Sequence, residues 1–293
     1  MNITDCFLLS DGRLRAGWRA ALFAVVFVAA LFVAGVLASL TGQVFSVALG
    51  VAIQAAATGG ATWLMLRWME ARPFVAVGLA WRRESSAELG WGFAGGIGLV
   101  GGLTAVEWGI GAIRFEGKTG GEGASVFVAL GMLTGLIILG ASYEEVLFRG
   151  YAFQRIIEGT NGTVAIAVSS AVFGWLHMSN PHATDLSTVN TVLAGVLLGL
   201  AYLRTRALWL PIGFHFGWNW MLAVLGHPVS GLEVAELPWR VAPVAEPVWL
   251  HGGSYGPEGG IVATGGLILG SLYLGVFCRF KEREAPGISE PRA

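Results

Sequence analysis

Eight long stretches of apolar residues run through the sequence, and few charged side chains interrupt them. A helix that crosses the ~30 Å hydrocarbon core of a bilayer needs about 20 such residues, because each residue advances the helix by ~1.5 Å. The sixth and seventh stretches are short for a crossing, but the pattern predicts an all-α fold, a polytopic integral membrane bundle of about eight transmembrane helices. The stretches lie at 18–40, 44–66, 88–113, 125–157, 163–185, 187–203, 207–225 and 259–278.

The composition excludes several other classes of protein. Of the 293 residues, 55% are hydrophobic and 13% are charged, whereas soluble proteins carry about 25% charged residues. The net charge of −1 provides no overall basic field that would attract nucleic acid. We therefore exclude an ordinary cytosolic enzyme, a nucleic-acid binder and a disordered chain, and we expect the lipid bilayer to surround this protein.

The basic residues predict the orientation of the helices. With eight spans both termini lie on one side of the membrane, and 15 of the 18 Lys and Arg residues fall on that side. Because basic residues gather in cytoplasmic loops, we expect both termini in the cytoplasm, at the inner membrane of a bacterial cell. The 15 residues are Arg13, Arg15, Arg19, Arg67, Arg72, Arg82, Arg83, Arg149, Arg155, Arg204, Arg206, Arg279, Lys281, Arg283 and Arg292. The other side receives Arg114, Lys118 and Arg240.

The domain organisation follows from the same map. We interpret residues 1–293 as a single integral membrane domain. The segment 226–258, rich in proline and glycine, is predicted to be an extracytoplasmic loop, and 280–293 a cytoplasmic tail. Glycine pairs spaced four residues apart, such as Gly92/Gly96 and Gly213/Gly217, predict helices that approach one another closely.

Three groups of polar residues stand inside the apolar spans. An ionisable side chain at the centre of a membrane helix costs about 2.5–3.5 kcal/mol or more, so it is retained where it is paired, lines a cavity or takes part in chemistry. The first group is Glu144, Glu145 and Arg149 in the fourth span. Glu145 and Arg149 are four residues apart and can pair on one helix face, which leaves Glu144 to face a cavity as a general acid or base.

The second and third groups contribute histidines. His177 lies in the fifth span, and a single histidine on an apolar face is as often structural as functional. His215 and Asn219 lie one turn apart in the seventh span, so both side chains share a helix face. Together they can bind a metal ion, a water molecule or a developing oxyanion.

The spacing of these groups indicates one common site. Glu144 and His177 are equally distant from the predicted turn at 159–162, so an antiparallel hairpin places them at the same depth, ~25 Å along the helices. The predicted span 125–157 is longer than a bilayer requires, and we expect it to tilt or project. The site is therefore expected in the cytoplasmic half of the membrane.

Two other classes of function use similar residues. Buried Glu, Arg and His side chains also form proton and substrate pathways, so a proton-coupled membrane transporter is an alternative. A non-catalytic scaffold or immunity protein with the same fold is another. Cleavage assays and transport assays distinguish these classes.

The order of the motifs EExxxR, FxxxH and HxxxN on separate spans resembles the Abi family of CAAX-prenyl-protease-type intramembrane endopeptidases. This family includes the Ras-converting CAAX endopeptidase and bacterial bacteriocin-immunity proteins. The resemblance covers about residues 125–225, which we expect to form the catalytic core. It implies an endopeptidase that hydrolyses peptide bonds of a membrane-associated protein or peptide.

The resemblance also implies a role for each motif residue. Glu144 acts as general base, and His177 helps to orient and activate a water molecule. His215 and Asn219 stabilise the tetrahedral oxyanion. These roles supply what peptide hydrolysis needs, namely an activated water, a proton shuttle and donors aimed at the developing charge.

The resemblance also bears on the two remaining motif residues and on a metal cofactor. Glu145 and Arg149 keep the other site residues in position, and Glu145 also assists the hydrolysis. The family has been described with both glutamate-type and metallo-type mechanisms. For a zinc enzyme, His177 and His215 with a glutamate are the metal ligands that the resemblance implies. The sequence lacks an HExxH motif, and we favour the metal-independent glutamate mechanism.

Overall fold

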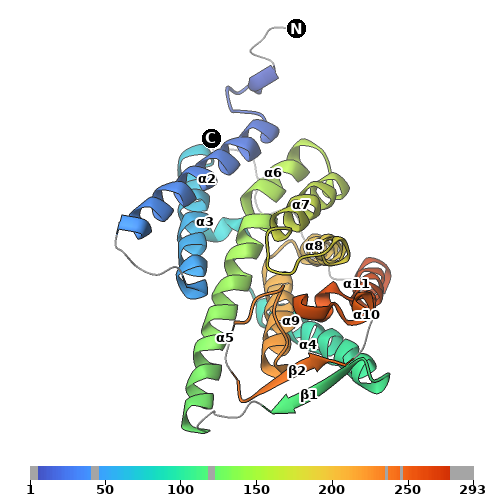
Figure 1. Cartoon of the computed structure of the whole chain (residues 1–293). Helices are drawn as coiled ribbons and strands as arrows, with labels where there is room; N and C mark the ends of the chain where they lie inside the picture. Colours follow the sequence, from blue (N-terminus) through green and yellow to red (C-terminus); the bar gives the residue numbers. More distant parts are fainter. Residues whose placement is uncertain (1–5, 41–45, 118–122, 235–236, 245–246, 278–293) are drawn as a thin grey trace.

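A bundle of helices makes up most of the structure, a computed structural model that describes residues 6–40, 46–117, 123–234, 237–244 and 247–277 (Figure 1). Each of the eight predicted spans corresponds to a helical segment. The α-helices are α2 Ala16–Leu40, α3 Val47–Met69, α4 Ser85–Gly109, α5 Gly123–Glu145, α6 Tyr151–Gly159, α7 Gly162–His177, α8 Asp185–Thr205, α9 Trp209–Leu225, α10 Val248–His251 and α11 Ile261–Leu272. Shorter turns are the 3-10 helices Phe74–Val77 (η1), Gly253–Tyr255 (η3) and Pro257–Gly259 (η4), and the π-helices Val146–Gly150 (η2) and Tyr273–Phe277 (η5).

Several helices are suited to a bilayer. Within the described part of the chain, five helices are long and apolar enough to cross a membrane. The helices α7 and α9, with 16 and 17 residues, are shorter. The protein is therefore a helical integral membrane protein, while the count of eight crossings and the cytoplasmic termini stay predictions. The five helices are Ala16–Leu40, Val47–Met69, Ser85–Gly109, Val126–Gly159 and Asp185–Thr205. The predicted tail, 280–293, lies outside the described residues.

The all-α prediction is wrong for one small element. Strands β1 (Ile113–Gly117) and β2 (Trp239–Pro243) form an antiparallel pair, with Ile113 opposite Pro243 and Gly117 opposite Trp239. The predicted span 88–113 ran into β1 because Ile110, Ala112 and Ile113 continue its apolar pattern. Helix α4 ends at Gly109, and Gly111 turns the chain with a φ of 75°.

The fifth predicted span is also shorter than expected. It was predicted to run over 163–185, but α7 ends at His177 and a turn follows before α8 begins at Asp185. Thr184 caps α8, because its side chain accepts a hydrogen bond from the Ser187 N–H and the Ser187 side chain accepts one from the Thr184 N–H. His177 therefore lies at a helix end beside a connection, not in the middle of a span.

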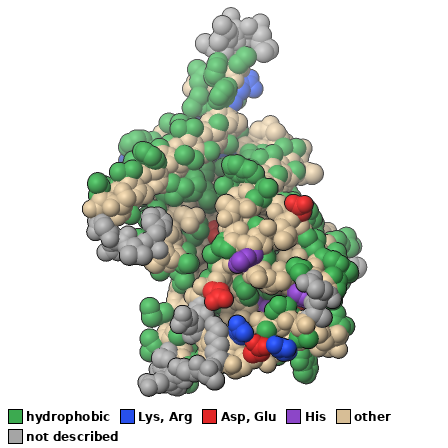
Figure 2. Space-filling model, in the orientation of Figure 1, with side chains coloured by type: hydrophobic (Ala, Val, Ile, Leu, Met, Phe, Trp, Pro, Cys, Tyr) green, Lys and Arg blue, Asp and Glu red, His purple; other side chains and the backbone are tan. Residues whose placement is uncertain are grey.

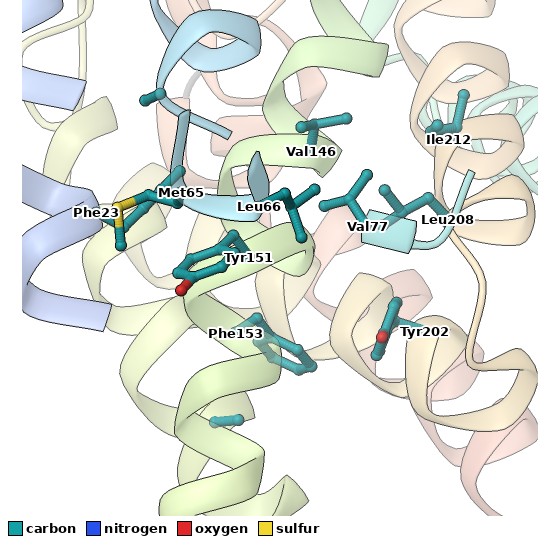
Figure 3. Packing of buried hydrophobic residues seen from close by; sticks show 12 residues of the cluster. Phe23, Met65, Leu66, Val77, Val146, Tyr151, Phe153, Tyr202, Leu208 and Ile212 are labelled. Carbon is teal, nitrogen blue, oxygen red and sulfur yellow. The ribbon is translucent and has the colours of Figure 1, made fainter. Parts of the chain in front are cut away.

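One hydrophobic cluster joins α2, α3 and η1 to η2, α6, α8 and α9 (Figure 3). Tyr151 and Phe153 of α6 extend from the chain segment that carries the glutamates, and Phe153 meets Tyr202 of α8 edge to face. This packing holds the α5–α6 segment against α8 and α9. The labelled members are Phe23, Met65, Leu66, Val77, Val146, Tyr151, Phe153, Tyr202, Leu208 and Ile212.

Glycines bring α4 and α9 into direct backbone contact, which confirms the close approach predicted from their spacing. A Cβ atom added to Gly96 would overlap the Phe214 carbonyl oxygen, and one added to Gly213 would overlap the Leu89 carbonyl oxygen. Helix α9 carries His215 and the asparagine of the HxxxN motif. The glycine contact therefore fixes the position of half of the candidate site.

Candidate active site

The four motif residues predicted to act on a substrate line one cavity. Its volume is about 680 Å³, within the range of ~300–1,000 Å³ usual for ligand pockets. Glu144 comes from α5, His177 from the end of α7, and His215 and Asn219 from α9. Helices distant in sequence thus bring these residues together, as the hairpin argument predicts for the first two.

Glu145 and Arg149 form a buried ion pair behind the cavity wall. Arg149 Nη1 lies 3.0 Å from Glu145 Oε1, and both side chains are fully buried. Arg149 also donates a hydrogen bond from Nη2 to the Gly195 carbonyl oxygen of α8, at 3.0 Å. His215 Nδ1 lies 2.9 Å from the same Glu145 oxygen. The pair therefore links α5 and η2 to α8 and α9 through charged hydrogen bonds.

Glu144 has a different environment, although it is the next residue along the chain. Its side chain is 21% exposed, and Oε2 lies 3.7 Å from His215 Nε2. The Tyr143 hydroxyl donates a hydrogen bond to Oε1 at 3.2 Å. Oε2 has no hydrogen-bond partner among the described residues. This carboxylate is thus positioned by one hydrogen bond and lines the cavity beside His215.

His177 is oriented by its own helix. The Nδ1–H donates to the Phe173 carbonyl oxygen at 2.7 Å, which leaves Nε2 for a ligand. The Phe173 ring packs against the imidazole, with 4.4 Å between centroids. The Arg149 guanidinium lies over the same ring, 5.0 Å from its centroid. The phenylalanine of the FxxxH motif therefore connects the histidine to the buried ion pair.

A third carboxylate, which the sequence motifs do not predict, lies beside the site. Glu258 of η4 lines the cavity and accepts hydrogen bonds from Trp218 Nε1 at 2.9 Å and from the Ser230 N–H at 2.5 Å. Burial raises the pKa of Glu258, while the Ser230 and Trp218 bonds and the nearby His177 act in the opposite direction. The sequence offered one signal, a lone acidic residue just before the last apolar stretch.

Residues outside the predicted spans also line the cavity. Ser179 and Asn180 follow α7, and Ser230 belongs to the 226–258 segment that was predicted to be extracytoplasmic. Asn180 Nδ2 donates to the Ser230 carbonyl oxygen at 3.0 Å, which joins the two connections. The early end of α7 places His177 next to this connection, while the predicted location in the cytoplasmic half stays a prediction.

The side chains present do not fit a zinc site. Structural and catalytic zinc ions are held by three or four Cys, His, Asp or Glu ligands. Within the described part of the chain, no three such side chains converge in a suitable arrangement. The two predicted ligands, His215 and His177, each donate Nδ1–H inside the protein, to Glu145 and to the Phe173 carbonyl, which leaves Nε2 of each ring free of these bonds. The mechanism below therefore includes no metal step.

The central segment is similar to known proteins. Residues 126–221 match the family model "Type II CAAX prenyl endopeptidase Rce1-like". The protein named "Putative membrane peptidase YdiL" of Bacillus subtilis (strain 168) is 30% identical over 88 residues, which are 30% of this chain and 34% of that protein. The match thus spans about a third of the length of this curated relative. No solved structure matches the chain significantly.

The fold and the site show a class of protein: a helical membrane protein with glutamate and histidine side chains that face a cavity inside the bundle. Histidine and acidic side chains are visible near the middle of one face (Figure 2). The comparisons confirm the resemblance to the CAAX-protease type over the segment that carries the motifs. This resemblance suggests a membrane peptidase.

Proposed function

We propose that this protein is an intramembrane endopeptidase that cleaves a membrane-associated protein or peptide with a water activated by Glu144. The observation that supports this most directly is the contrast between two adjacent carboxylates. Glu145 is fully buried in an ion pair with Arg149 and does not line the cavity, whereas Glu144 lines the cavity with a side chain that is 21% exposed. A general base has to face the space that a substrate and a water molecule enter.

In the proposed reaction, Glu144 removes a proton from a water molecule that His177 orients. The water oxygen bonds to the peptide carbonyl carbon and produces a tetrahedral oxyanion. Glu144 then gives the proton to the amide nitrogen, the C–N bond breaks, and a carboxylic acid and an amine leave, which become a carboxylate and an ammonium ion when the acid proton passes to the amine. One residue thus serves as base and then as acid, so the protons balance.

His215 and Asn219 stabilise the oxyanion in this proposal. His215 donates from Nδ1 to Glu145, so a hydrogen bond from Nε2 to the oxyanion requires a doubly protonated ring. Carboxylates on both sides, Glu145 at 2.9 Å and Glu144 at 3.7 Å, provide the counter-charge for that ring before the reaction, and Glu145 keeps its charge once Glu144 has taken the proton. Asn219 lines the same cavity one turn further along α9 and supplies a neutral amide donor.

The test uses purified protein in proteoliposomes, a peptide library and mass spectrometry of the fragments. We expect cleavage by the wild type and a loss of about 10²–10⁴-fold in Glu144→Gln, the range of a general base. Glu84→Gln, which changes an exposed carboxylate just before α4, is the matched control and keeps activity. Cleavage that is unchanged in Glu144→Gln contradicts the mechanism, and solute transport without cleavage favours a transporter.

A further inference from the structure

Tyr143 stands directly beside Glu144 in the wall of the cavity. It belongs to the last turn of α5, its side chain lines the cavity, and only 8% of the residue is exposed. The Tyr143 hydroxyl donates a hydrogen bond to Glu144 Oε1 at 3.2 Å. Because a phenolic hydroxyl accepts hydrogen bonds as well as donating them, this group can receive one proton while it gives up another.

The two carboxylate oxygens of Glu144 have different surroundings. Oε2 is buried and lies 3.7 Å from His215 Nε2. Because Glu145 fixes the His215 ring through Nδ1, that ring stays directed at Oε2. The exposed part of the Glu144 side chain therefore lies among its methylene groups and Oε1, the oxygen that Tyr143 contacts. A water molecule in the cavity thus meets the carboxylate on the side where the phenolic hydroxyl stands.

The same stretch of α5 leaves room for a substrate. Gly140 lies one turn before Glu144 and also lines the cavity. A Cβ atom added at Gly140 would meet nothing described within 4 Å, so the helix wall is open at this point. Residues three and four positions apart are neighbours on a helix surface. A peptide that lies against α5 at Gly140 therefore has its amide beside both Tyr143 and Glu144.

We propose that Tyr143 is a catalytic residue, which relays the proton from Glu144 to the nitrogen of the leaving amine. The inference rests on the proposed peptidase function. Once Glu144 holds the water proton on Oε1, the Tyr143 hydroxyl turns and accepts that proton while its own O–H proton bonds to the nitrogen. The oxyanion re-forms the C=O bond, and the electron pair of the C–N bond leaves with the nitrogen. Tyr143 ends as a neutral phenol and Glu144 as a carboxylate, so both are ready for the next cycle.

The test compares two substrates that differ in their need for a proton. One is a peptide that the wild type cleaves in the library assay, and the other is the p-nitrophenyl ester of its acyl half. The nitrophenolate leaves as an anion, whereas an amine has to be protonated to leave. We expect Tyr143→Phe to lower kcat for the peptide by about 10²-fold, as loss of a general acid does, and to leave kcat for the ester and both KM values close to wild type. Glu144→Gln should lower kcat for both substrates, because both need the activated water.

The outcomes separate a relay from mere positioning of the glutamate. Tyr202→Phe makes the same change in the buried cluster of Figure 3, away from the cavity lining, and should leave kcat for both substrates unchanged. Equal losses on peptide and ester in Tyr143→Phe overturn the proposal, because they show that Tyr143 only positions Glu144. An unchanged kcat for the peptide overturns it as well. A wild type that cleaves no peptide of the library contradicts the peptidase function on which the relay rests.

A measurement on the unaltered protein guards against a variant that misfolds. The kcat of the wild type for the peptide is determined in mixtures of light and heavy water. A relay through Tyr143 moves two protons in one step, so we expect the plot of kcat against the deuterium fraction to curve. A straight plot indicates that a single proton moves in that step, and it overturns the relay whatever the variants do.

Discussion

His215 Nδ1 lies 2.9 Å from Glu145 Oε1, and Arg149 holds that same oxygen from the other side at 3.0 Å. Three charged or chargeable groups from α5, η2 and α9 thus meet at one atom inside the bundle. Such an arrangement fixes the imidazole ring, because a displaced ring would leave a buried carboxylate with one partner fewer. The ring in turn sets where its Nε2 points, toward Glu144 and the cavity.

Replacing each glutamate of the adjacent pair should separate stability from catalysis. Glu145→Gln leaves Arg149 buried without its ion partner, which costs about 3–5 kcal/mol in comparable pairs. Glu144→Gln removes a partly exposed carboxylate that has no ion pair with arginine or lysine among the described residues. We expect Glu145→Gln to lower the unfolding temperature in detergent strongly, and Glu144→Gln to abolish cleavage with little change in unfolding. Equal unfolding curves for the two variants would contradict the roles assigned here.

Most of the site contacts that the sequence predicts follow from the spacing of residues along a single helix. The i,i+4 positions of Glu145 and Arg149 predict their ion pair, and the structure contains it. The contribution of Glu258 could not be predicted, because it depends on how a long connection folds back onto α9. Trp218 Nε1 and the Ser230 N–H donate hydrogen bonds to this carboxylate, and both bonds join residues far apart in sequence. The β1–β2 pair was missed for the same reason.

Glu258 is expected to act as a positioning residue. Its carboxylate fastens the segment around Ser230 to Trp218, between the two motif residues of α9, and its charge faces His177. Glu258→Gln keeps the shape but removes the charge, so we expect kcat to fall and the pH profile of kcat to shift, while KM stays close to that of the wild type.

A matched control distinguishes this role from simple support of the fold. Glu233→Gln changes an exposed carboxylate in the same segment and should leave the pH profile unchanged. Glu258→Asp, which retains the charge, should restore the wild-type profile at least in part. Identical pH profiles for the wild type and Glu258→Gln would refute the positioning role.

Acid should destabilise the protein through His227. Burial lowers the pKa of His227 from 6.5 to about 4, and its Nε2 lies 3.1 Å from the Thr104 hydroxyl. In the unfolded chain His227 is protonated below about pH 6.5, whereas in the folded chain it is protonated only below about pH 4. The free energy of unfolding therefore falls as pH decreases across this window, by about 3 kcal/mol at ~1.4 kcal/mol per pKa unit.

The measurement is chemical unfolding at a series of pH values between these limits. His227→Asn has no group that titrates there, so its stability should depend less on pH than that of the wild type. His182→Asn changes an exposed histidine with a left-handed backbone and serves as the control with an unchanged profile. A wild-type slope that persists in His227→Asn would assign the acid sensitivity to another group.

The α4–α9 glycine contact should be sensitive to a single methyl group. At Gly96 a Cβ would overlap backbone atoms of α9, whereas at Gly98, on the same helix, nothing described lies within 4 Å of an added Cβ. We expect Gly96→Ala to destabilise the protein by about 1–3 kcal/mol, as overpacking does. Because α9 carries His215, cleavage should fall as well. Gly98→Ala should leave thermal unfolding and cleavage close to wild type, and a similar loss in both variants would exclude the close contact as the cause.

Removal of metal should not stop cleavage. Within the part of the chain that the structure describes, no three His, Cys, Asp or Glu side chains are arranged to hold a metal ion. We expect activity to survive dialysis against EDTA and 1,10-phenanthroline, and elemental analysis of the active protein to find zinc well below one ion per chain. The decisive comparison is between His177→Ala and the wild type. If zinc is bound one to one, is lost in His177→Ala, and restores activity to the chelated wild type when added back, the glutamate mechanism proposed here is replaced by a metal-dependent one.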